Sequence, residues 1–282
     1  MSRTTKLMGT ACVLAASFVA GPAAADTLAG FTAMATINYT HTSVTSSSST
    51  PDSNQAGIGG AIAMPIDEVS GLNWQLDGNY NHIWGSCGDG GSCSAELWNL
   101  GFSPFWAGQS GRLGINANYA TETHLGHLTN AGLFTEWYFG PLTVAAKGGW
   151  LSSGGAAVGG HGNYFGGAVT FYALPNLSIT GAADWNDLVT GRGCSTCGRT
   201  DLHNWYLSAI VEFLISEAWP ISIYGGFTYG HHTDSLFDDH FNTSTFLVGV
   251  HYYLGRGMPL IDQHRNGNLV PWLRGASPNG PL

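Results

Sequence analysis

Hydrophobic and polar positions alternate along most of this chain, in blocks of roughly ten to thirteen residues. The clearest block runs from Leu72 to Trp84: even positions read Leu, Trp, Leu, Gly, Tyr, His and Trp, whereas odd positions are mostly Asn, Gln and Asp. Residues 113–122 and 177–186 repeat this period of two. Because successive side chains of a β-strand point to opposite faces, the pattern predicts strands with one apolar and one polar face.

The whole pattern predicts an all-β chain whose connections alternate in length. Short turns follow every second predicted strand, and longer polar segments follow the others. This alternation is typical of a single antiparallel up-and-down transmembrane β-barrel, with short periplasmic turns and longer extracellular loops. About twelve strands are predicted, at residues 30–43, 56–66, 72–84, 95–106, 112–123, 130–139, 142–152, 163–174, 177–188, 202–214, 220–231 and 243–254.

The apolar face of these strands is predicted to meet lipid. The opposite face carries Asn, Gln, Ser, Thr, Gly and Ala with few charges, whereas the outside of a soluble β protein needs Lys and Glu. Tryptophans fall near predicted strand ends, never at a centre, as in the aromatic belts of membrane proteins. A soluble barrel or sandwich is the alternative. The tryptophans are Trp74, Trp106 and Trp137 on the turn side, and Trp84, Trp98, Trp150, Trp185 and Trp205 on the loop side.

Composition narrows the class of protein further. Charged residues make up 10% of the 282 residues and the net charge is −9, whereas soluble domains have roughly 25% charged residues. A nucleic-acid partner is excluded, because phosphate neutralisation needs clustered Lys and Arg. Beyond the first 25 residues the chain has no apolar run long enough for a spanning helix.

The N-terminus has the order of a secretory signal peptide. Arg3 and Lys6 precede an apolar stretch, and Ala23 to Ala25 form a small-residue cleavage site. An uncleaved membrane anchor is the alternative. Cleavage after Ala25 leaves seven bases and eighteen acids, a net charge of −11. The predicted division is a signal peptide at 1–25, a barrel at 26–255, and a periplasmic tail or partial plug at 256–282, with Trp272 as the apolar contact of such a plug.

These features together, with the closing strand Phe246 to Leu254, resemble the Gram-negative outer-membrane β-barrels of porin-like architecture. The resemblance covers about residues 26–255 and is architectural, because no motif indicates one particular family. It implies a location in the outer membrane, contact with outer-membrane lipid and lipopolysaccharide, and insertion by the barrel-assembly machinery. The chain departs from this class at its end, where residues 255–282 follow the last strand.

The inward face defines the candidate lumen. Its charge is net −3, which predicts a weak preference for cations. Inward Gly and Ala, such as Gly101 and Gly166, favour an opening, although a lumen filled by its own side chains is the alternative. Glu136 and Lys147 are predicted to form an ion pair. The candidate lining residues are the acids Asp77, Glu122, Glu136, Asp184 and Glu212, the bases Arg112 and Lys147, and the amides Asn79, Asn116 and Asn118.

Two loop features carry further candidate chemistry. Cys87 and Cys93 bracket one loop and Cys194 and Cys197 another, which predicts disulfides in an oxidising compartment, although four cysteines allow three pairings. A zinc site would need the two pairs to converge. The histidine-rich segment 231–240 is a weak metal candidate and otherwise a hydrated acidic loop; its candidate ligands are His231, His232, Asp238 and His240.

The predicted function is a passive channel for small polar, weakly cation-preferred solutes, without a cofactor. The alternative is a non-transporting barrel that serves adhesion, partner binding or envelope structure. An enzyme is not predicted: the outer-membrane phospholipases place His, Ser and Asn on the lipid side, whereas this chain offers His82, Thr121 and Thr135 there without a neighbouring Ser.

Overall fold

The computed structural model describes residues 31–45, 52–67, 70–86, 92–123, 126–154, 158–192, 199–234, 239–254 and 258–266. Within these ranges the chain forms twelve β-strands and one short helix. The signal-peptide prediction falls outside them. The strands are β1 (Thr32–Thr45), β2 (Asp52–Asp67), β3 (Leu72–Ser86), β4 (Ser92–Gly108), β5 (Gly111–Glu122), β6 (Gly126–Phe139), β7 (Leu142–Gly154), β8 (Val158–Leu174), β9 (Leu177–Arg192), β10 (Arg199–Ser216), β11 (Ile221–Asp234) and β12 (Asp239–Leu254).

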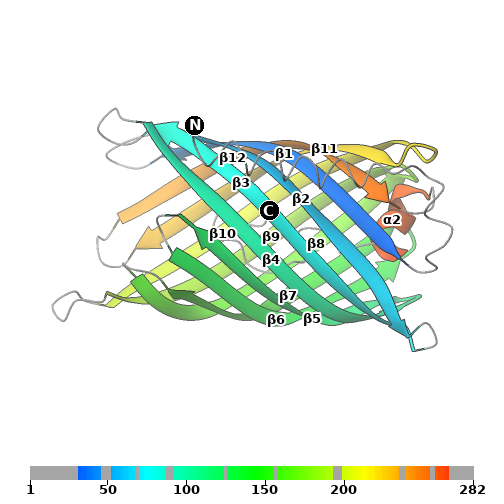
Figure 1. Ribbon diagram of the computed structural model, residues 1–282, viewed down its shortest axis with the longest axis horizontal. Helices are drawn as coiled ribbons and strands as arrows, with labels where there is room; N and C mark the ends of the chain where they lie inside the picture. The colour runs from blue at the N-terminus through cyan, green and yellow to red at the C-terminus, as the bar shows by residue number, and fades with distance from the viewer. Residues whose placement is uncertain are drawn as a thin grey trace, which may run out of the picture.

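The strands close into one barrel (Figure 1). Each strand pairs antiparallel with its neighbours in sequence, and β1 pairs with β12, from Ala33 opposite Leu254 to Thr45 opposite Asn242. Closure pairs both edges of every strand, so no edge is left with open backbone hydrogen-bonding groups. The predicted fold class, an all-β up-and-down barrel of twelve strands, is confirmed.

Burial alternates along the strands with the period seen in the sequence. In β5, Arg112, Asn116 and Asn118 are buried, whereas Leu113 and Ile115 are exposed. In a closed barrel the buried positions face the interior and the exposed positions face the surroundings. The outer surface is therefore apolar and the inner surface largely polar.

Several strands run further toward the loop end than the sequence pattern indicates. β8 begins at Val158 and β9 ends at Arg192, several residues beyond the predicted limits. Backbone pairing between these strands continues beyond the last apolar outward residue. Hydrophobic alternation therefore shows the extent of the apolar outer belt and not the full length of the paired strands. As a result Trp185 lies at the middle of β9 and not near its end.

Local sequence explains the turns and one irregularity. Gly140 joins β6 to β7 with a φ of 55°, a conformation that glycine adopts without a Cβ clash and that tight hairpins require. Pro104 lies inside β4, where pairing with β3 continues but pairing with β5 is interrupted between Phe102 and Phe105, without a change of register. Proline has no N–H for the ladder, so it leaves one edge of the strand unpaired.

After β12 the chain forms the helix α2 (Leu260–Asn266), which lies at the turn end of the barrel, beside the end of β12 (Figure 1). Leu260 is fully buried against Met34, Leu214 and Tyr253, and its N–H donates to the carbonyl oxygen of Pro175 at 2.8 Å. Among the described residues, no helix has the length and apolarity needed to cross a membrane.

Candidate functional site in the barrel lumen

The predicted lining residues lie on the inner side of the barrel wall, distributed over β3, β5, β6, β7, β9 and β10. Seven of the ten predicted residues are buried and three are half-buried. The buried ones are Asp77, Arg112, Asn116, Asn118, Glu136, Lys147 and Glu212; the half-buried ones are Asn79, Glu122 and Asp184.

Two ion pairs connect inward charges of neighbouring or nearby strands. The Nζ atom of Lys147 lies 3.1 Å from Oδ1 of Asp184, and Nε of Arg112 lies 3.9 Å from Oε2 of Glu136. The expected partners were Glu136 and Lys147, but the register places Glu136 opposite Ala145 and Lys147 opposite Phe134. Glu136 on β6 instead pairs toward β5, and Lys147 on β7 pairs toward β9. Strand parity predicts that these residues face inward but not which of them pair.

The inward glycines do not by themselves widen the lumen. At Gly101 the space that a side chain would take is held by Asp77 and Asn118, and at Gly166 it is held by Asp184 and Lys147. At Gly249 it is held by the ring of Tyr224, which crosses β12 to reach Oγ1 of Thr36 on β1 at 3.2 Å. These glycines let long polar side chains lie flat against the wall, and an open lumen stays a prediction.

An asparagine-rich wall covers the inner side of β1 and β3 to β6. Within it, Nδ2 of Asn118 donates to Oδ1 of Asn130 at 3.1 Å, and the Tyr164 hydroxyl donates to Oδ1 of Asn116 at 3.1 Å. Among the described residues, several buried amide atoms have no protein hydrogen-bond partner: Oδ1 of Asn38, Asn79, Asn81 and Asn99, and Nδ2 of Asn116. An unpartnered buried amide costs about 1–3 kcal/mol, so this wall suits polar molecules that enter the lumen.

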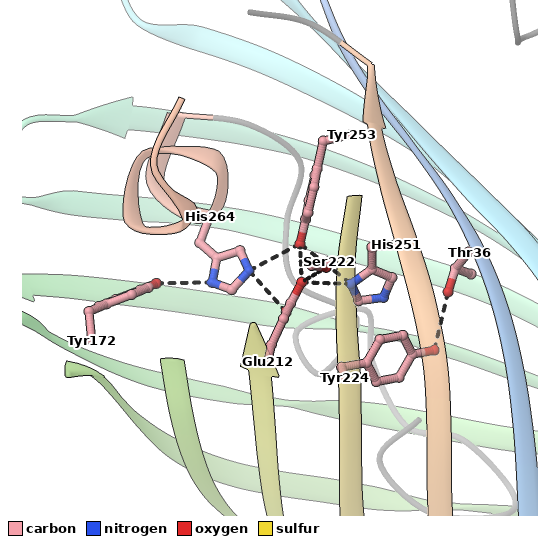
Figure 2. Close-up of polar contacts among 8 residues, drawn as sticks. All are labelled: Thr36, Tyr172, Glu212, Ser222, Tyr224, His251, Tyr253 and His264. Atoms are coloured by element: carbon pink, nitrogen blue, oxygen red, sulfur yellow. Dashed lines mark hydrogen bonds and ion pairs between the residues drawn. The ribbon is translucent and has the colours of Figure 1, made fainter. Parts of the chain in front are cut away.

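At the turn end, Glu212 is the centre of a buried polar network (Figure 2). Its carboxylate accepts hydrogen bonds from Ser222, from the Tyr253 hydroxyl at 2.6 Å and from Nδ1 of His251 at 3.0 Å. These residues belong to β10, β11 and β12. Three strand residues therefore hold the carboxylate of Glu212 in a fixed place at the end of the lumen.

Helix α2 adds His264 to this network. Nε2 of His264 lies 3.2 Å from Oε2 of Glu212, and its Nδ1 lies 3.1 Å from the Tyr172 hydroxyl (Figure 2). An imidazole that carries its proton on Nε2 donates to Glu212 and accepts from Tyr172, so both contacts are satisfied at once. The helix thus connects β8 with β10 across the turn end.

Arg265 of α2 occupies a second site on the wall. Its guanidinium carbon lies 4.7 Å from the ring centre of Tyr138 and 5.4 Å from that of Tyr172. Its Nε donates to Oγ1 of Thr143 at 3.1 Å, and its Nη2 donates to the carbonyl oxygen of Leu142 at 2.8 Å. Two aromatic rings and two oxygen acceptors together match a planar guanidinium.

Sequence reasoning found Glu212 as an inward residue but missed its grouping with His251 and with α2. It also missed Tyr138 and Tyr172, although both have the inward parity near turn ends. The available signal was the pair His264-Arg265 in a segment outside the barrel pattern. Trp272, the expected contact of this segment, lies outside the described residues; the buried apolar residue of α2 is Leu260.

The candidate metal ligands are divided between the two faces of the wall. His231 contacts Trp205 on the outer side, whereas His232 faces inward, with Nδ1 2.8 Å from Oδ1 of Asn204. Consecutive strand residues point to opposite faces, and β11 continues through both to Asp234, beyond the predicted strand end at 231. Asp238 lies outside the described residues. Within the described part, no three His, Cys, Asp or Glu residues are grouped to hold a metal.

The cysteines can be placed only in part. Cys93 lies near the start of β4, opposite Gly85, whereas Cys87, Cys194 and Cys197 lie outside the described residues. Disulfide formation stays a prediction.

The tryptophans of the predicted belts are on the outer surface. Trp74 is half-buried beside Phe102, and the other seven are 37–57% exposed. Trp74 and Trp84 are ten positions apart on β3. At about 3.3 Å per residue and a tilt of about 45°, ten positions correspond to roughly 23 Å, close to the height of an outer-membrane apolar band.

A closed twelve-strand barrel with an apolar outer belt and a polar interior has the architecture of the outer-membrane β-barrels. The chain matches no protein-family model and no curated protein sequence. Solved structures agree on the fold. An outer-membrane channel from Pseudomonas putida F1 superposes with a TM-score of 0.56 at 11% identity, over 79% of this chain and 95% of that one.

Two further similar structures are outer-membrane β-barrels. The KdgM porin superposes with a TM-score of 0.43 at 11% identity, over 77% of this chain and 98% of that one. The translocator domain of the autotransporter NalP from Neisseria meningitidis has a TM-score of 0.48 at 14% identity, over 88% of this chain and 97% of that one. The closed antiparallel barrel and its superposition on the P. putida structure show the fold of an outer-membrane β-barrel, and no particular family is identified.

Proposed function

We propose that this protein is a passive channel in the outer membrane of a Gram-negative bacterium, for small polar solutes with a weak preference for cations. The observation that carries the proposal is the polar inner wall, where five acids face two bases. Arg112 and Lys147 each pair with one acid, and the acids exceed these two bases by three charges. A similar P. putida structure bears the name of an outer-membrane channel, which supports this class.

The cellular setting belongs to the same proposal. The signal peptide directs the chain out of the cytoplasm, the barrel-assembly machinery inserts it, and lipid and lipopolysaccharide surround its apolar belt. The loop cysteines form disulfides in that oxidising compartment. The proposed role needs no catalytic residue and no cofactor.

The test is the current through folded protein in a planar lipid bilayer with a KCl gradient across it. The wild type should conduct, with a reversal potential that shows cation preference. In the double variant Asp77→Asn with Glu122→Gln, the cation-to-anion permeability ratio should fall roughly fivefold, because two charges in a hydrated lumen contribute about 1 kcal/mol together.

Glu217→Gln is the control, because Glu217 is an exposed acid in the turn before β11 and its substitution removes one negative charge outside the lumen. Its selectivity should equal that of the wild type. Absence of current from correctly folded protein would overturn the channel and favour the non-transporting alternative.

A further inference from the structure

We infer that the turn-side mouth of the lumen contains a binding site for guanidinium-bearing solutes, and that Arg265 of the chain's own helix α2 occupies it in this structure. The inference rests on the proposed function, since it names a class of solute for the same lumen. It also gives α2 a role, as a tethered ligand that competes with solute for the site.

The site is built by the barrel wall and not by the helix. Tyr138, Thr143 and Tyr172 come from three adjacent strands, β6, β7 and β8. The Tyr138 hydroxyl donates to Oε2 of Glu136 at 2.8 Å, so a wall residue fixes this ring independently of α2. The position of Tyr138 is therefore set by the wall, whereas the Tyr172 hydroxyl is also hydrogen-bonded to His264 of α2. A ring held in place before binding lowers the cost of ordering the site.

The contacts of Arg265 select a guanidinium over an ammonium ion. The group lies within 5.4 Å of both ring centres, and two different nitrogens donate to two separate acceptors, Thr143 and Leu142. An ammonium ion is a compact point charge without this planar, forked set of donors. A methylated guanidinium can reproduce both hydrogen bonds and both ring contacts.

The charges around the site favour a cation. Glu136 accepts a hydrogen bond from Tyr138, and Glu212 lies 3.2 Å from Nε2 of His264, the residue before Arg265. The opposing cation is Arg112, whose Nε lies 3.9 Å from Oε2 of Glu136, whereas Glu212 is contacted by the imidazoles of His251 and His264 at 3.0 and 3.2 Å. A cation that enters the site replaces the charge of Arg265, so the local balance of charge is unchanged by the exchange.

Release of α2 breaks no strand pairing. The helix is held by Leu260, by the hydrogen bonds of His264 and Arg265, and by one backbone hydrogen bond to Pro175. A segment outside the ladder can open at less than the free energy of global unfolding. Exchange between Arg265 and a solute is therefore compatible with an intact barrel.

The test measures binding of methylguanidinium chloride by calorimetry in the detergent-solubilised full chain. Arg265→Ala vacates the site and should bind methylguanidinium, with methylammonium at least roughly tenfold weaker. The wild type should bind methylguanidinium roughly tenfold more weakly than Arg265→Ala, because its own arginine competes. Adding Tyr172→Leu to Arg265→Ala should weaken binding roughly 5- to 10-fold through loss of one ring.

Asn266→Ala is the control, because Asn266 is the exposed last residue of α2 and its variant should behave as the wild type. Folding of each variant is verified by its heat-dependent mobility in gels. If Arg265→Ala does not fold, Arg265→Gln replaces it, since a neutral side chain also leaves the rings free.

No heat from the folded variant, or equal heats for methylguanidinium and methylammonium, would overturn the inference. Bilayer current distinguishes this inference from the proposed function. Binding without current would support the guanidinium site and contradict the channel. Current without binding would support the channel and contradict the site.

Discussion

At the scale of single residues, the inner wall depends on pairs in which a glycine makes room for a neighbouring side chain. The ring of Tyr224 lies directly over Gly249 and reaches Thr36, two strands away from β11. It also stacks on His251, with ring centres 4.1 Å apart. The glycine is thus a requirement of close packing, because any Cβ at this position would enter the volume of the ring.

We therefore predict that Gly249→Ala destabilises the barrel by about 1–3 kcal/mol, the usual cost of overpacking. Gly181→Ala is the matched control, because a Cβ at Gly181 meets no atom within 4 Å. Urea unfolding followed by tryptophan fluorescence in lipid vesicles measures both. Equal midpoints for the two variants would contradict the assigned role of Gly249.

At the scale of one element, each strand has two environments that differ in what they tolerate. On β6, Leu133 is 60% exposed on the outer face near the strand centre, whereas its sequence neighbour Phe134 is 1% exposed inside. The outer position faces the proposed hydrocarbon layer, where a charge has no hydrogen-bonding partner. The cost of a charge there depends on depth, since water and headgroups solvate the strand ends.

Leu133→Arg is accordingly predicted to lower the free energy of unfolding in a bilayer by about 2–4 kcal/mol, and Phe139→Arg, at the turn end of β6, by about 0–1 kcal/mol. Equilibrium unfolding in thin phosphatidylcholine vesicles measures the difference. If the two substitutions cost the same, the outer face of β6 is not the depth-dependent lipid surface proposed here.

At the scale of the whole molecule, α2 joins parts of the barrel that are far apart in sequence. Its contacts reach β1 and β12 through Leu260, β10 through Glu212, and β6 to β8 through Arg265. Leu260 is fully buried, so its side chain contributes most of the apolar part of this docking. The helix can therefore be undocked by one substitution without a change in any strand.

Leu260→Asp should undock α2 while the barrel stays folded. Burying a carboxylate is unfavourable, and this free-energy cost weakens only the contact between α2 and the barrel. Limited trypsin digestion should then cleave after Arg265 at least roughly tenfold faster than in the wild type, since a loss of 2 kcal/mol or more is typical of such core positions. Asn266→Asp, at an exposed position of the same helix, should leave the cleavage rate unchanged. Barrel unfolding together with faster cleavage would contradict independent docking.

Much of this architecture could be predicted from the sequence. A period of two specified which residues face inward and outward, so Asp77, Glu136, Lys147 and Glu212 were assigned to the interior, and Trp106 and Trp137 to the exterior. The alternation of turn and loop lengths specified an antiparallel meander, and the number of segments gave twelve strands. These features depend on local strand geometry and on burial, and the order of apolar and polar residues along the chain indicates both.

Only the tertiary structure decided which inward residues meet. Barrel closure and strand register bring Lys147 to Asp184, Tyr224 to Thr36 and Arg265 to Tyr138, pairs that parity alone leaves undetermined. Whether an inward glycine opens space or receives a neighbour also depends on those contacts. The sequence alone determined the face of each residue because strand geometry is local; the partners follow from the closed barrel, which fixes the relative shift of twelve strands at once.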